Sequence, residues 1–123
     1  MSGLGLLLLS NVVFAEQKLP PKSWIDPDTG HRVIRITDEP GSASLYFNIN
    51  AYTPDGKQMI YTTANRGIGL IDLATFTTRP LVEGPVGGGP GAVVVGRKTF
   101  TVYYFKGQKG NPQYASLWSA NIH

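Results

Sequence analysis

Four side chains suited to binding a sugar lie along one short stretch of the sequence. They are Tyr46, Asn48, Asn50 and Tyr52. They alternate with apolar residues, so a β-strand would place all four on one face. Aromatic rings stack on sugar rings and amides bind sugar hydroxyls, which makes this row a candidate carbohydrate contact. A polar contact between neighbouring sheets is the alternative interpretation of the same row.

Two further residues are candidates for contact with an anionic ligand. His31 follows a turn, and it either touches an anionic sugar or caps the strand that it begins. Arg66 lies in a short loop, where its guanidinium either pairs with a carboxylate through two hydrogen bonds or is solvated. For Asp72 we expect a structural, hydrogen-bonded carboxylate rather than a catalytic one.

Several kinds of active site are excluded by residue types that the chain lacks. It contains no cysteine and only two histidines, His31 and His123. Thiol nucleophiles, disulfides and zinc knuckles are therefore excluded, and one copy of the chain cannot assemble a histidine-rich metal centre. No phosphate-loop signature and no Gly-x-Ser-x-Gly elbow is present. We therefore predict no catalytic residue, no metal ligand and no cofactor in this chain.

The composition is typical of a turn-rich chain with little net charge. Eleven Lys and Arg against eight Asp and Glu give a net charge of +3, which does not imply a nucleic-acid partner. Fifteen Gly and nine Pro indicate many turns. The length of 123 residues allows one domain of ordinary size.

The first fifteen residues have the features of an export signal. An apolar core at Leu6–Leu9 precedes small residues at Val13 and Ala15, the positions before a signal-peptidase cut. The apolar run is shorter than the roughly 20 residues of a membrane span. The sequence therefore predicts a signal peptide at 1–15, a linker at 16–23 and a periplasmic or extracellular location. If the segment is instead a buried first strand or helix, the protein is cytoplasmic.

Alternation of apolar and polar residues predicts strands over the mature chain. An entry strand and loop occupy 24–43, and a first four-stranded meander occupies 44–82. Its strands are expected at 44–52, 58–63, 68–73 and 78–82. The Pro and Asp-Gly of 53–57 favour a hairpin turn, and the proline of the fourth strand suits a sheet edge.

The strand pattern restarts after a Gly/Pro-rich connection at 83–91. Strands are expected at 92–95, 99–105 and 116–122, with a polar loop at 106–115. A four-strand unit that repeats after about 40–45 residues is the signature of propeller blades. We therefore predict an all-β fold of antiparallel meanders, with a second, incomplete blade at 92–123.

Two stretches resemble known families of β-propellers. The segment Asn50–Leu73, NAYTPDGKQMIYTTANRGIGLIDL, resembles the TolB-like blade pattern. The segments beginning WIDPDTGHRVIRITDEP and VVVGRKTFTVYY resemble the N-terminal part of oligogalacturonate lyase-like proteins. This resemblance implies a seven-bladed propeller that degrades unsaturated oligogalacturonides from pectin by β-elimination. It also implies a divalent, Mn-like metal, which histidines of later blades hold and for which this chain has no matching positions.

Three hypotheses follow for the function of the chain. The first is the N-terminal part of an oligogalacturonate lyase-like enzyme, inactive alone, whose full-length form acts on uronate oligosaccharides. The second is a non-catalytic TolB-like module that binds protein or glycan. The third is a small β protein of which several copies close one ring. The sequence leaves the oligomeric state open.

Overall fold

The computed structural model describes residues 20–87 and 92–123. Within them the chain forms eight strands and no helix, and the strand pairs are antiparallel. The predicted all-β fold of meanders is therefore confirmed, whereas the predicted signal peptide lies outside the described residues. The chain divides into two compact units, Met1–Arg35 and Ile36–His123. No helix able to cross a membrane occurs in the described part of the chain.

The described part of the first unit contains one short hairpin. Strand β1 (Ser23–Ile25) pairs with β2 (Arg32–Ile34). The turn between them is closed by Asp26, whose Oδ1 accepts the backbone N–H of Thr29 at 2.8 Å. The single entry strand expected within 24–43 is thus a hairpin of two three-residue strands, and β1 begins at Ser23, the last residue assigned to the linker.

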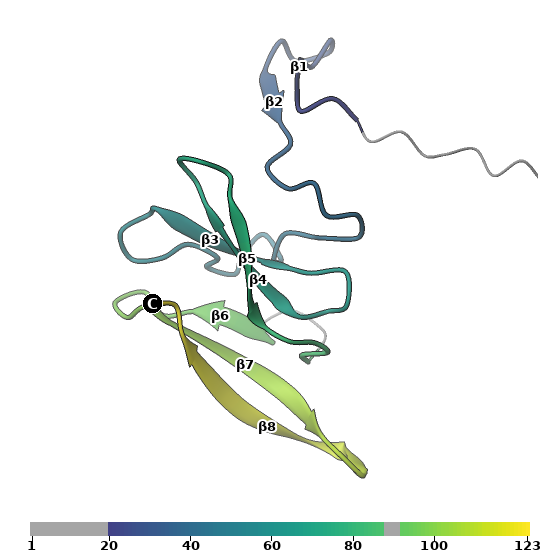
Figure 1. Cartoon of the computed structure of the whole chain (residues 1–123), viewed down its shortest axis with the longest axis vertical. Coiled ribbons are helices and arrows are strands. Elements are labelled where there is room, and N and C mark those ends of the chain that lie inside the picture. The colour runs from purple at the N-terminus through teal and green to yellow at the C-terminus, as the bar shows by residue number, and fades with distance from the viewer. Residues whose placement is uncertain (1–19, 88–91) are drawn as a thin grey trace, which may run out of the picture. The chain divides into compact units, whose positions relative to one another are not determined.

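The second unit begins its regular structure with a three-stranded sheet, here called the first sheet (Figure 1). Its strands are β3 (Gln58–Thr62), β4 (Ile68–Asp72) and β5 (Thr78–Val82), in that order. The tight turn before β3 closes where the Thr53 N–H donates to the Gln58 carbonyl at 3.0 Å. These three strands and the turn are those that the sequence predicted, and the proline of β5 lies in an edge strand.

The strand predicted at 44–52 is wrong. A turn interrupts the segment, because the Ile49 N–H donates to the Tyr46 carbonyl at 2.9 Å. The only bridge inside the segment joins Tyr52 to β3. Phe47, expected on the apolar face, is 88% exposed. The first sheet therefore has three strands, since alternation predicts two faces but does not supply a ladder partner for the whole segment.

The second sheet consists of β6 (Val93–Val95), β7 (Thr101–Gln108) and β8 (Asn111–Asn121). The polar loop predicted at 106–115 is wrong, because β7 and β8 continue as a long hairpin with a register shift after Gly107. Backbone ladder hydrogen bonds do not require apolar side chains, so a polar sequence can still extend a hairpin. Figure 1 shows this hairpin reaching beyond the first sheet.

One apolar core lies between the two sheets. The first sheet contributes Ile60, Ile68 and Leu70, and the second contributes Val95, Val102 and Tyr104, with Ile122, Ala51 and Val86 beside them. Ile60 and Val102 are completely buried. Burial of an aliphatic side chain contributes about 1.5–3 kcal/mol, so this core holds the two sheets together.

The two sheets are built alike. In the second sheet, the Gly96 N–H donates to the Thr101 carbonyl at 2.9 Å and closes a hairpin of the same length as the one from Thr53 to Gln58. Aligning the two hairpins makes β7 equivalent to β3, and the strand registers make β8 equivalent to β4. Strands β5 and β6 have no equivalent strand in the other sheet. The structure thus repeats a two-stranded hairpin, but the first sheet has three strands rather than the predicted four, and the propeller stays a prediction.

Candidate functional site

The six residues predicted to contact a ligand are divided between the two units. His31 lies in the first unit, exposed in the β1–β2 turn, where its backbone N–H donates to Thr29 Oγ1 at 3.3 Å. The other five belong to the second unit and are described separately.

The row of tyrosines and asparagines is divided by the turn at 46–49. The Tyr46 ring packs against the neighbouring Phe47 ring at a centroid distance of 4.6 Å. Asn50 is half-buried, and its Nδ2 donates to the Tyr52 carbonyl at 3.0 Å and to the Val95 carbonyl at 3.2 Å. For Asn50 this is the polar contact between sheets that was the alternative interpretation. A sugar contact by the exposed members of the row stays a prediction.

Arg66 lies in the loop between β3 and β4, and Asp72 is the last residue of β4. Arg66 has a left-handed backbone, with a φ of 60°, and its side chain is exposed. Asp72 Oδ1 accepts the backbone N–H groups of Ala74 and Thr75 at 3.0 and 2.9 Å. Hydrogen bonds from the Thr75 N–H and hydroxyl lower the pKa of Asp72. Asp72 is thus a structural turn residue, as predicted.

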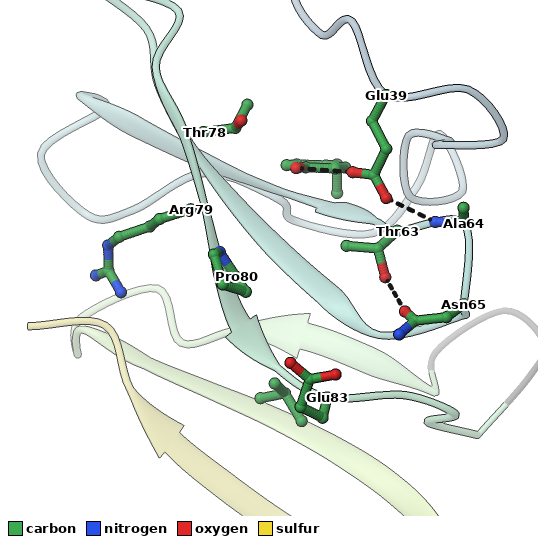
Figure 2. A pocket seen from close by; sticks show the side chains of 10 residues that line it. Glu39, Thr63, Ala64, Asn65, Thr78, Arg79, Pro80 and Glu83 are labelled. Atoms are coloured by element: carbon green, nitrogen blue, oxygen red, sulfur yellow. Dashed lines mark hydrogen bonds between the residues drawn. The ribbon is translucent and has the colours of Figure 1, made fainter.

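A polar groove of about 450 Å³, the Glu39 groove, lies on the first sheet (Figure 2). The Glu39 carboxylate accepts the Tyr61 hydroxyl at 3.1 Å and the Ala64 N–H at 3.0 Å. Burial raises the pKa of Tyr61, and its hydrogen bond to Glu39 raises that pKa further. The Glu39 carboxylate therefore accepts hydrogen bonds from both the Tyr61 hydroxyl and the Ala64 N–H at this end of the groove.

The remaining groups of the Glu39 groove are also largely engaged with the protein. The Thr63 hydroxyl donates to Asn65 Oδ1 at 2.6 Å, and the Arg79 guanidinium donates to the Ile122 carbonyl. Glu83 is exposed at the rim. The groove can accept a small polar ligand by hydrogen bonding, but its residues do not pair a nucleophile with a base.

A second groove, the Trp118 groove, has a volume of about 410 Å³ on the β7–β8 hairpin. Its lining residues are Tyr104, Lys106, Gly107, Gln108, Lys109, Ser116 and Trp118. Trp118 is 53% exposed, whereas Tyr104 is 7% exposed and forms the buried end. Gln108 Nε2 donates to Ser116 Oγ at 3.1 Å. The lining combines aromatic rings, two ammonium groups and no acidic side chain.

The two grooves occupy equivalent places in the two sheets. Tyr61 lies opposite Gly69 in the first sheet, and Tyr104 lies opposite Trp118 in the second. Aligning the two hairpins by register places Tyr104 at the position of Tyr61. Gly107 does not correspond to Ala64, because Gly107 pairs with Ala115 inside β7 whereas Ala64 lies in the turn after β3. Of the two groups that hold Glu39, only the tyrosine therefore has an equivalent in the Trp118 groove.

Charge is distributed unevenly along the chain. All eight acidic residues lie at or before Glu83, whereas residues 84–123 contain four basic residues and no acidic one. Sequence reasoning from the net charge of +3 missed this segregation, although it is visible in the sequence. Lys106 and Lys109 of the Trp118 groove belong to the basic part, so this groove favours an anion.

Among residues 20–87 and 92–123, no three His, Asp or Glu side chains gather as a metal site. The residues described here do not fit the histidine-held metal of the resembling family. That expectation concerns later blades and stays a prediction.

Comparison of this chain with protein-family models, with curated proteins and with solved structures finds no match.

Proposed function

We propose that this chain is the N-terminal part of an exported, oligogalacturonate lyase-like carbohydrate-active enzyme. It contributes two consecutive blades of a propeller and a place for an acidic sugar, while catalysis resides elsewhere. The observation that carries the proposal is the repeat: two stacked antiparallel meanders with equivalent hairpins, within the stretch that resembles this family.

The polar turns that follow β4 and β8 support the assignment to blades. Asp72 lies opposite Gln58, and Asn121 lies opposite Thr101, the equivalent of Gln58. Asn121 Oδ1 accepts the His123 N–H at 3.0 Å, just as Asp72 Oδ1 accepts the N–H two residues after it. The same polar turn therefore recurs where a blade repeat requires it.

The outer face of the second sheet also supports a larger stack of blades. Ile60 and Ile68 are covered by the second sheet, but their equivalents Tyr103 and Leu117 are 38% and 65% exposed. Propellers cover each such face with the next blade. We propose that a further sheet covers Tyr103 and Leu117.

The reaction of the resembling family sets requirements for its active site. In uronate β-elimination a base removes the proton at C5, and the C4–O bond breaks as a C4–C5 double bond forms. A cation must neutralise the adjacent carboxylate while a base accepts the proton. The resemblance implies that later blades carry these groups, so we assign binding and scaffolding to this chain.

Two measurements on the full chain test the proposed function. Calorimetry is expected to show saturable binding of saturated digalacturonate and none of neutral galactobiose. Incubation with unsaturated digalacturonate, with and without Mn²⁺, is expected to give no turnover. Turnover by the chain alone, or the absence of galacturonide binding, would contradict the proposal.

The exposed outer face favours one alternative function. A TolB-like module that binds a protein through Tyr103 and Leu117 would expose the same side chains. Such a module would bind no galacturonide, so the calorimetric titration separates the two functions.

A further inference from the structure

We propose that the Trp118 groove is a binding subsite for a carboxylated sugar ring, with the ring on Trp118 and the ligand carboxylate beside Lys106. The identification of the sugar as a uronate rests on the proposed function. The preference for a carboxylate rests on Lys106 and Lys109 and on the absence of an acidic side chain from the lining.

In the first sheet the tyrosine of the repeat already holds a carboxylate, because the Tyr61 hydroxyl donates to Glu39. In the second sheet Tyr104 is the equivalent tyrosine, and residues 84–123 contain no acidic side chain. The ammonium groups of Lys106 and Lys109 at this groove therefore have no acidic neighbour among its lining residues, and a ligand carboxylate would supply the missing negative charge.

The strand register adds a cation next to this position. Tyr104 lies opposite Trp118, and Lys106 lies opposite Ser116, one step further along the same face. Diagonal neighbours on an antiparallel face are about 7–8 Å apart, so the Lys106 ammonium can reach a carboxylate on a ring above Trp118. A hydrogen bond between charged partners is about twice as strong as a neutral one.

Trp118 supplies the stacking surface for the sugar ring. It lies on the face of the second sheet that forms the core, but the hairpin extends beyond the first sheet, and the indole remains 53% exposed. Gln108 and Ser116, bonded to each other at 3.1 Å, place an amide and a hydroxyl at the same groove. These groups suit the hydroxyls of a sugar.

The size of the groove favours a short saccharide over a nucleic acid. About 410 Å³ lies within the range of small-ligand sites. A single-stranded nucleic acid needs a basic track over about four or more nucleotides with successive stacking positions. Only one exposed aromatic side chain, Trp118, lines this groove.

Calorimetry on the full chain tests the subsite with digalacturonate as the probe. Trp118→Ala and Lys106→Gln are each expected to weaken binding at least about tenfold. Tyr114→Ala is the matched control, because Tyr114 is an exposed aromatic of β8 that does not line the groove. It should bind as the wild type does. In a Trp24→Phe protein, Trp118 is the only tryptophan, and its fluorescence should change saturably on titration.

The possible outcomes separate the subsite from the proposed function. If wild type binds digalacturonate and both groove variants bind equally well, the subsite is wrong and the proposed function stands. If wild type binds no galacturonide, the proposed function fails and the sugar assignment fails with it. Tighter binding of oligo(dT) than of digalacturonate would overturn the subsite in favour of nucleic acid. Unchanged thermal unfolding of the variants shows that lost binding is not lost folding.

Discussion

The Tyr61 hydroxyl donates to the Glu39 carboxylate across a distance of 3.1 Å, although the two residues are 22 positions apart. This bond ties the segment before the first sheet to the face of β3 that is turned away from the core. The equivalent position in the second sheet has the tyrosine without the glutamate. The hydrogen bond between Tyr61 and Glu39 therefore attaches the preceding segment to the first sheet. Tyr104, the equivalent tyrosine, has no such glutamate, because residues 84–123 contain no acidic side chain.

Removal of this hydroxyl is expected to lower stability in a pH-dependent way. Tyr61→Phe should cost about 1 kcal/mol at neutral pH, because Glu39 loses a hydrogen-bond donor. The pKa of Tyr61 is raised above 10.0, so its contribution is complete below pH 10 and is lost as the pH rises through the higher folded-state value. Urea unfolding from neutral pH to about pH 11 should show the difference between wild type and variant shrinking. A constant difference would contradict this; Tyr103→Phe, at an exposed tyrosine, is the control.

Asp72 is expected to stabilise the first sheet only while it is ionised. Its pKa is lowered from 3.8 by hydrogen bonds, so its contribution is present above pH 3.8 and is lost as the pH falls through the lower folded-state value. Asp72→Asn keeps an acceptor oxygen, as Asn121 has naturally, and should flatten the acid side of the stability profile. Asp72→Ala removes the acceptor and should destabilise the protein more than Asp72→Asn does at neutral pH, with the cost disappearing as the pH falls through the folded-state pKa of Asp72. Identical unfolding profiles of the two variants would contradict this account.

Gly69 is expected to tolerate no side chain. A Cβ at this position would overlap the ring of Tyr61, which lies opposite it. Gly69→Ala should therefore cost about 1–3 kcal/mol, as measured by urea unfolding. The cost should fall in a Tyr61→Ala background, where the overlapping ring is absent. Gly107→Ala is the matched control, since a Cβ there meets nothing within 4 Å. Equal costs at the two glycines would disprove the overlap.

Alanine substitutions of Asn50 and Asn48 are expected to differ in their effect on stability, although both residues are asparagines and lie only two positions apart. Asn50→Ala removes the hydrogen bond to the Val95 carbonyl at 3.2 Å and should cost about 1 kcal/mol. Asn48 is exposed, and Asn48→Ala should leave the unfolding midpoint nearly unchanged. Thermal unfolding of both variants is the measurement. A larger loss at Asn48 would mean that the contact between sheets is not the role of Asn50.

Local signals predicted the first sheet well. The Pro and Asp-Gly of the turn before β3 restrict the backbone by themselves, and β5 spans Thr78–Val82 as predicted. The structural role of Asp72 was also predictable, because an aspartate after a strand bonds to backbone a few residues away. One property of the candidate site could also be predicted from the sequence. All acidic residues lie at or before Glu83, so the later part of the chain, which forms the Trp118 groove, is basic.

Tertiary structure decided the features that depend on distant partners. The alternation at 44–52 could not reveal that β3 bridges this segment only at Tyr52, and composition could not reveal that 106–115 extends a hairpin. The sequence by itself determined the all-β class and the turns, because these depend on residues that are close along the chain. Only the register between β7 and β8 placed Lys106 beside Trp118, because strand pairing joins residues that no local pattern connects.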